Sequence, residues 1–126
     1  STLLGVMAQR LVRTLCPPCK KPVDPPDDDT WRMMWAPWRA EKPQQVMGTA
    51  GCLECRMTGY YGRMGLYALM LMTPGIRSLV HADADDSSIR EQAFKDGMRP
   101  LRVSGAQKIA AGMTTADEVM KVAPLG

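Results

Sequence analysis

Four cysteines in two Cys-x-x-Cys pairs are the residues of this sequence best suited to chemistry. Cys16 and Cys19 form the first pair, Cys52 and Cys55 form the second, and residues 20–51, a stretch of 32, separate them. Zn²⁺ favours four thiolate or imidazole ligands at tetrahedral corners, and a two-residue spacer lets one tight turn supply two sulfurs. The two turns together therefore predict a complete four-sulfur zinc site.

The predicted site is closed, which favours a structural metal over a catalytic one. A catalytic zinc keeps one position for water or substrate, and the only histidine, His81, is far from the cysteines in sequence. The gap exceeds the roughly 15–20 residues of the commonest four-cysteine pattern, but loop-closure entropy grows only logarithmically with length. Disulfides and a redox pair are the alternatives; they suit secreted chains and thioredoxin-like settings, and nothing here resembles a signal peptide.

Length and composition are those of one small domain or two small lobes. The chain has 126 residues, 45% of them hydrophobic, and a formal net charge of +3. Four thiolates and one Zn²⁺ would lower that charge to about +1, which argues against nucleic-acid binding through a basic face. No apolar run reaches the roughly 18 residues of a membrane span, so we expect no transmembrane segment. Because the sequence opens on Ser1 without an initiator Met, we expect a piece of a longer protein.

Two helices are predicted before the second cysteine pair. A first helix over residues 3–15 follows from apolar residues at helical spacing, namely Leu4, Ala8, Leu11, Val12 and Leu15. A short second helix is capped by Asp29 or Thr30 and carries Trp31, Met34, Trp35 and Trp38 on one face. We expect this Trp-rich face to fold back onto the zinc module, and the alternative is a docking patch for a partner.

The second half predicts a strand followed by helices. Residues 64–72 are almost continuously apolar and predict a buried strand, paired with short segments that flank the cysteines. Cap signals then begin four helices, at Thr73-Pro74, Ser88-x-x-Glu91, Pro100 and Thr115-x-x-Glu118. The predicted fold class is a small mixed α+β protein: a tetracysteine zinc module with short strands, followed by a small helical bundle.

His81 and three nearby carboxylates form no predicted site. A lone histidine at a helix C-terminus is favoured there by the helix dipole when protonated, so we expect His81 to be structural or solvated. Asp83, Asp85 and Asp86 resemble half of a calcium loop, but the glycine and the bidentate glutamate of that loop are missing. We therefore reject calcium binding.

Several motifs in order resemble the C-terminal part of the secretion ATPase family, the hexameric motors of type II secretion and type IV pilus assembly. The motifs are Ala8-Gln9-Arg10-Leu11-Val12-Arg13-Thr14-Leu15-Cys16-Pro17-x-Cys19-Lys20, Gly51-Cys52-x-x-Cys55-x-x-Thr58-Gly59-Tyr60-x-Gly62-Arg63-x-Gly65-Leu66-Tyr67, Gly97-Met98, Gly112-x-Thr114-Thr115 and Glu118-Val119. The resemblance runs from about residue 2 to residue 122. The sequence departs from the usual pattern of the family at Met64 and Ala68 and in its Trp-rich insertion.

The resemblance implies a division of the chain and a role for it. Residues 1–14 would be the C-terminal helix of the ATPase core, 15–72 a tetracysteine zinc-binding subdomain with the Trp-rich insertion, and 73–126 a helical C-terminal subdomain. Cys16, Cys19, Cys52 and Cys55 would hold structural zinc. The parent would be cytoplasmic and peripheral to the bacterial inner membrane, where its partners are platform proteins of the machine and neighbouring subunits of a homohexamer.

Catalysis is not expected from this chain itself. It contains no Gly-x-x-x-x-Gly-Lys-Ser/Thr loop to hold phosphates and Mg²⁺, so ATP and Mg²⁺ would belong only to the parent. The resemblance thus implies a structural and coupling module between an ATPase core and a membrane platform. The competing hypothesis is a free-standing zinc-ribbon module that binds nucleic acid or another protein.

Overall fold

The computed structural model describes residues 5–124, which fold into two antiparallel two-stranded sheets and five helices. In chain order the elements are β1 (Gly5–Leu15), β2 (Lys21–Val23), α1 (Asp28–Trp35), β3 (Val46–Gly48), β4 (Tyr60–Leu71), α2 (Pro74–His81), α3 (Asp86–Lys95), α4 (Leu101–Ala110) and α5 (Ala116–Val122). This arrangement confirms the predicted small mixed α+β class.

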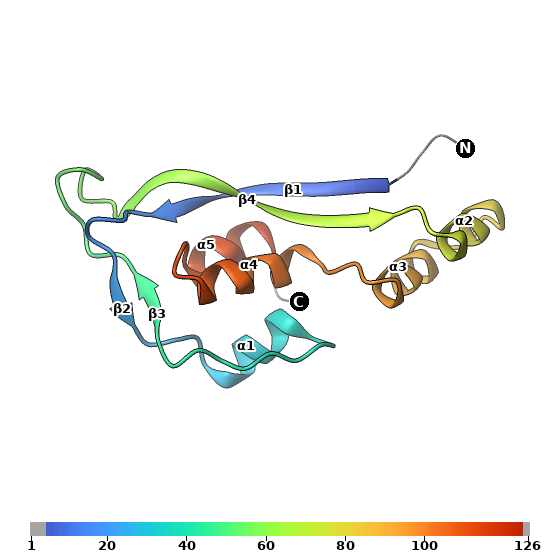
Figure 1. The fold of residues 1–126 in the computed structure, drawn as a ribbon, viewed down its shortest axis with the longest axis horizontal. Helices are drawn as coiled ribbons and strands as arrows, with labels where there is room; N and C mark the ends of the chain where they lie inside the picture. Colours follow the sequence, from blue (N-terminus) through green and yellow to red (C-terminus); the bar gives the residue numbers. More distant parts are fainter. Residues whose placement is uncertain (1–4, 125–126) are drawn as a thin grey trace.

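A long ribbon of β1 and β4 runs along one side of the molecule, and α4 and α5 lie against it (Figure 1). The strands pair antiparallel from Gly5 opposite Leu71 to Leu15 opposite Tyr60. The inner face of the ribbon buries Val12 and Leu66 at 2% and 0% exposure. These side chains join α4 and α5 in one core cluster, completed by Trp31, Met34, Val46, Ala106, Ile109, Val119 and Ala123.

The predicted helix over residues 3–15 is wrong, because Gly5–Leu15 form strand β1. Leu4, part of the predicted helical stripe, lies outside the described residues. Strand β1 gains its hydrogen bonds from β4, which is about fifty residues away in sequence and is invisible to local spacing. Both faces of the ribbon carry apolar residues: Met7 and Leu11 on the outer face are 59% and 49% exposed, so the alternation typical of a strand is absent.

The predicted strand over residues 64–72 is confirmed as part of β4, but its partner and its burial differ from the prediction. The partner of β4 is β1, whereas the short segments next to the cysteines pair with each other as β2 and β3. The outer face of β4 is open, with Leu69 and Leu71 at 49% and 58% exposure. The sequence thus placed the strand correctly and misassigned its neighbour.

Most predicted helix boundaries in the second half are confirmed. Thr73 caps α2 by accepting a hydrogen bond from Ile76 N–H, and Thr115 caps α5 in the same way through Glu118 N–H. Helix α4 begins after Pro100 and ends before Gly112, whose φ of 75° suits glycine. The predicted Ser88 cap is wrong: Asp85 is the N-cap of α3 and accepts from Ser88 N–H at 2.9 Å.

The Trp-rich face is also corrected in part. Asp27, rather than Asp29 or Thr30, caps α1. The helix turns its Trp31 and Met34 side chains inward, at 4% and 0% exposure, where they join Val46 and Leu66 in the core cluster and the helix packs on α4. Trp38 lies beyond the helix and contacts Phe94.

Within residues 5–124, none of the helices combines the length and the apolar composition that crossing a bilayer requires. The longest, α3 and α4, have 10 residues each.

Candidate metal centre

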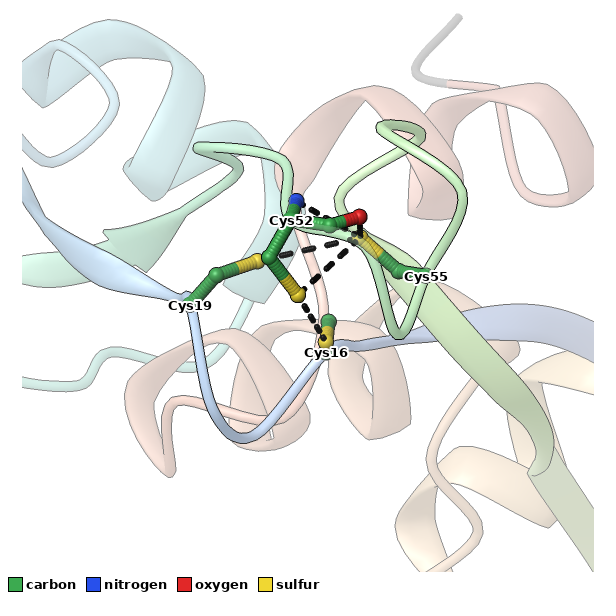
Figure 2. A group of neighbouring side chains, drawn as sticks. All are labelled: Cys16, Cys19, Cys52 and Cys55. Atoms are coloured by element: carbon green, nitrogen blue, oxygen red, sulfur yellow. Dashed lines mark hydrogen bonds between the residues drawn. The ribbon is translucent and has the colours of Figure 1, made fainter.

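Two turns bring all four cysteine sulfurs together at one end of the β1–β4 ribbon. Figure 2 shows the side chains converging, Cys16 and Cys19 from the turn after β1 and Cys52 and Cys55 from the turn before β4. Their sulfurs all lie within 4.8 Å of one another. Among the described residues this is the only group of His, Cys, Asp and Glu side chains with such spacing.

The sulfur spacing matches a tetrahedral metal site better than disulfides. The Sγ–Sγ distances are 3.7 Å for Cys16 and Cys52, and 3.8 Å both for Cys19 and Cys55 and for Cys52 and Cys55. A tetrahedron with Zn–S bonds of about 2.3 Å has sulfur–sulfur edges of about 3.8 Å. A disulfide requires about 2.05 Å. The four residues are free cysteines, arranged to hold a metal ion.

Backbone hydrogen bonds explain why these two sequences form metal-binding turns. In the first turn, Lys20 N–H donates to Cys16 C=O at 3.0 Å, and in the second, Met57 N–H donates to Cys52 C=O at 2.8 Å. Cys16 N–H also donates to Gly59 C=O at 2.9 Å, which joins the turns directly. The sulfurs are therefore positioned by main-chain geometry.

Gly59 is required at its position for two reasons. Its φ of +83° lies in the left-handed region, and an added Cβ would stand 2.3 Å from Thr49 Cβ. Its N–H donates to Cys55 Sγ at 3.2 Å, and Cys52 N–H donates to the same sulfur at 3.3 Å. Two N–H dipoles aimed at one sulfur favour the thiolate, which is the form that binds metal.

The electrostatic environment differs between the buried sulfurs. Burial, together with the neighbouring cysteine thiols, raises the pKa of Cys16 to about 12. Burial also opposes ionisation of Cys55, but the Cys52 and Gly59 N–H groups outweigh it and lower the pKa of Cys55 to about 6. A bound divalent cation would favour the thiolate at every sulfur.

The helical part is fastened to the cysteine turns by polar contacts that the sequence did not reveal. Leu15 N–H donates to Met113 C=O at 2.9 Å, and Lys20 Nζ donates to Gly112 C=O at 2.9 Å. Thr114 Oγ1 donates to Arg13 C=O at 2.7 Å. These three hydrogen bonds hold the loop between α4 and α5 against the end of β1 and the turn that carries Cys16.

A buried glutamate completes this connection. Glu118 is 5% exposed and accepts from Arg13 N–H at 2.8 Å, Arg13 Nη2 at 2.9 Å and Lys121 Nζ at 3.0 Å. The Arg13 guanidinium hydrogen bond, followed by backbone and Lys121 hydrogen bonds, overcomes burial and lowers the pKa of Glu118 to about 2. In the sequence Glu118 suggested only a capping box. The sequence did carry one signal for a buried ion pair: Glu118 interrupts the apolar face of α5.

The other sequence candidates do not join the cysteines. His81 is exposed at the C-terminal end of α2, as expected of a solvated residue. Asp83 and Asp86 are exposed, and Asp85 caps α3. The hydrogen bonds that Asp85 accepts from Ser88 lower its pKa, which is ordinary for a helix cap.

Fold and site together define a small α+β module built on a tetracysteine cluster. The family described as type II/IV secretion system protein matches residues 1–121, and the chain belongs to this family. Strong similarity to individual family members supports the assignment. The expected family resemblance is thereby confirmed.

Similar proteins come from both type IV pilus assembly and type II secretion. The chain is 43% identical over 125 residues to the type IV pilus assembly ATPase TfpB of Acinetobacter baylyi. It is 37% identical over 122 residues to the type II secretion system ATPase E of Vibrio cholerae, and 38% identical over 122 residues to the type II secretion system protein HxcR of Pseudomonas aeruginosa.

These matches cover nearly the whole chain and a minor part of each relative. They include 99%, 97% and 97% of this chain, but only 21%, 24% and 22% of the relatives' own lengths. The chain thus spans between a fifth and a quarter of these relatives.

Proposed function

We propose that this chain is the zinc-binding C-terminal region of a hexameric ATPase of type II secretion or type IV pilus assembly. The observation that carries the proposal is the four-sulfur cluster with tetrahedral edge lengths, in a chain of the type II/IV secretion system family. Cys16, Cys19, Cys52 and Cys55 are the proposed ligands. An all-thiolate donor set favours zinc over the oxygen-seeking cations Mg²⁺ and Ca²⁺.

The proposed role is structural and mechanical. Zinc, when bound, joins the turns that precede and follow the segment over residues 20–51, which contains β2, α1 and β3. The hydrogen bonds of Leu15 and Lys20 to the α4–α5 loop then extend this rigid unit into the helical part. Such a unit can couple nucleotide-driven movement in an ATPase core to the membrane platform of the machine.

The proposal includes a division of the chain and a location. Residues 1–14 would connect to the ATPase core, although most of them form a strand rather than the expected helix. Residues 15–72 would be the zinc-binding subdomain and 73–126 the helical C-terminal subdomain.

The full-length parent protein would be cytoplasmic and peripheral to the bacterial inner membrane, with platform proteins and neighbouring subunits of a homohexamer as partners. ATP and Mg²⁺ would bind only in the parent, and no nucleic acid is expected.

Native mass spectrometry of the purified chain tests the metal site. We expect one zinc per reduced chain, together with loss of zinc in a Cys52→Ser variant. A metal-free chain with paired disulfides would overturn the zinc assignment. Specific, salt-dependent DNA or RNA binding by the zinc-loaded chain would instead favour the free-standing zinc-ribbon alternative.

The coupling role is tested in the full-length parent. Cys52→Ser should abolish secretion or pilus assembly while nucleotide binding remains largely intact, because the phosphate-binding loop lies outside this chain. The matched control is Ser78→Ala in α2, an exposed side chain remote from the cysteines in the fold. Normal secretion by the Cys52→Ser parent would refute the coupling role.

A further inference from the structure

A groove beside α1 combines all three tryptophans with basic side chains. It has a volume of about 340 Å³, and its lining includes Trp31, Trp35, Trp38, Arg32, Arg39 and Lys42. Ligand pockets of comparable size are usually lined by aromatic side chains with a few placed polar groups. The Trp-rich insertion therefore forms a shaped surface as well as part of the core.

Contacts within the chain hold the aromatic walls in place. Trp31 is 4% exposed, its Nε1 donates to Ala40 C=O at 3.1 Å, and its ring centroid lies 6.2 Å from that of Trp35. Trp38 is fixed between Phe94, at a centroid distance of 5.4 Å, and the Arg99 guanidinium, 3.9 Å from the ring centre. A groove with fixed walls loses less conformational entropy when it binds a ligand.

The helix that carries the groove is anchored at its C-terminal end by α4. Arg102 Nε donates to Met33 C=O at 3.1 Å, and Arg102 Nη2 donates to Ala36 C=O. These contacts satisfy carbonyl groups that the last turn of a helix leaves unpaired. The groove and α4 therefore form one rigid unit.

The charges at the groove leave an excess of positive potential. Asp28, also in the lining, pairs with Lys42 at 2.6 Å, and Arg32 pairs with Asp29. Arg39 is exposed and has no salt bridge within residues 5–124. The groove thus presents a guanidinium available to an incoming carboxylate.

We propose that this groove binds an extended, acidic, proline-containing peptide segment of a partner protein. Such a segment adopts a polyproline II conformation, in which no carbonyl is used internally and proline rings can stack on aromatic walls. Its acidic side chains complement Arg39, which is exposed in the lining of the groove. The inference goes beyond the proposed zinc module and does not depend on its coupling role.

Other occupants fit the groove less well. The tryptophans line a concavity instead of projecting from the surface, which disfavours insertion into a bilayer. The carboxylates of Asp28 and Asp29 stand beside the groove and oppose a polyphosphate backbone. A peptide with a few separated carboxylates avoids both difficulties.

The test uses the metal-loaded 126-residue chain and a synthetic acetylated peptide with the sequence Glu-Pro-Pro-Glu-Pro-Pro-Glu. Tryptophan fluorescence and ¹H–¹⁵N NMR titration should show saturable binding, with shifts confined to the indole N–H signals and α1. Arg39→Glu should weaken binding about tenfold or more.

A matched control separates local contacts from the general charge of the chain. Arg90→Glu makes the same charge change at an exposed position on α3 and should alter the affinity by less than about twofold. NMR spectra of each variant must show the native fold before its affinity is interpreted. Equal weakening by Arg39→Glu and Arg90→Glu would overturn the proposal.

Further probes distinguish the chemistry of the occupant. Peptides with alanine for proline or lysine for glutamate should bind at least about fivefold more weakly. No saturable shift at millimolar peptide on the folded chain would overturn the proposal. Tighter binding to phosphatidylglycerol vesicles or to oligothymidine than to the peptide would also overturn it, in favour of a membrane or nucleic-acid surface.

Discussion

At the scale of single residues, Gly59 shows how strongly the cysteine turn depends on backbone conformation. Gly59→Ala places a Cβ at φ +83° and 2.3 Å from Thr49 Cβ, so the turn must shift and its N–H must leave Cys55 Sγ. We expect a loss of about 2–4 kcal/mol in unfolding free energy. Urea denaturation of the metal-loaded chain measures it, and a chelator competition should show weaker metal binding.

Gly62→Ala is the matched control for this change. Gly62 has the same φ of +83°, but an added Cβ there meets nothing within 4 Å. We expect only the conformational cost of about 1 kcal/mol and an unchanged metal affinity. Equal losses in the two variants would mean that the Thr49 contact and the sulfur hydrogen bond contribute little.

Glu118 should make the unfolding free energy of the chain depend on pH. Its folded pKa of about 2 lies below the ordinary value of 4.5, so its ionisation stabilises the fold above pH 4.5 and this contribution is lost as pH falls toward 2. We expect Glu118→Gln to cost about 2–3 kcal/mol at pH 7, a figure reduced because Arg13 is partly exposed. The cost should shrink by about 1 kcal/mol at pH 4.

Paired urea titrations of the two proteins at pH 7 and pH 4 test this prediction. Metal thiolates protonate in acid in both proteins, so only the difference between them reports on Glu118. Asp117→Asn, at an exposed neighbouring position, should show no comparable pH-dependent difference. A Glu118→Gln cost that stays constant with pH would contradict the assigned charge of Glu118.

At the scale of elements, two of the helix caps were predictable from the sequence and the pairing of the strands was not. Thr73 and Thr115 cap their helices through local hydrogen bonds that lie within three residues, so spacing alone located them. The β1–β4 pairing joins Val12 to Met64, and no local pattern encodes such a contact. Both faces of β1 carry apolar residues, and their positions matched helical spacing by coincidence.

The contact between α4 and α5 predicts that replacing Gly105 by alanine destabilises the fold, although alanine has the higher helix propensity. Gly105→Ala should stabilise an isolated helix by about 1 kcal/mol, but the added Cβ would lie 2.3 Å from Val119 Cγ1. Since Val119 is fully buried and cannot move freely, we expect a net loss of about 1–3 kcal/mol in unfolding free energy. Thermal and urea denaturation measure the sign directly.

A double variant tests whether the contact with Val119 causes the loss of stability in Gly105→Ala. In Gly105→Ala/Val119→Ala, removing the two Cγ methyl groups makes room for the new Cβ, so the two changes should cost less together than the sum of their separate costs. Strictly additive costs, or stabilisation by Gly105→Ala alone, would show that α4 and α5 are not in the close contact described.

At the scale of the whole molecule, the cysteine spacing predicted the cluster, while its attachment to the rest of the fold was not predictable. The metal ligands could be identified from the sequence because each Cys-x-x-Cys motif supplies two sulfurs within four residues. The hydrogen bonds from Leu15 to Met113 and from Lys20 to Gly112 span more than ninety residues. The sequence therefore indicated a metal module and a helical bundle without showing that they form one core.

The elongated shape predicts a graded response to metal removal. The cysteine turns lie at one end of the β1–β4 ribbon and α2 and α3 at the other (Figure 1). Chelation should raise amide hydrogen exchange in β2, in β3 and around Tyr60, because the sulfurs there lose their common ligand. Helices α2 and α3 contact each other, and Thr73 Oγ1 donates to Asp96 at 2.5 Å, so their exchange should change little.

Hydrogen exchange with mass spectrometry compares the metal-loaded chain before and after chelator treatment. Cys52→Ser should reproduce the chelated pattern without chelator, and chelator should then have no further effect on it, which separates metal loss from any direct action of the reagent. A uniform rise that includes α2 and α3 would mean that metal binding is coupled to global unfolding. Unchanged exchange around Tyr60 would mean that the turns keep their structure without metal, because the hydrogen bond from Cys16 to Gly59 would then suffice to hold them together.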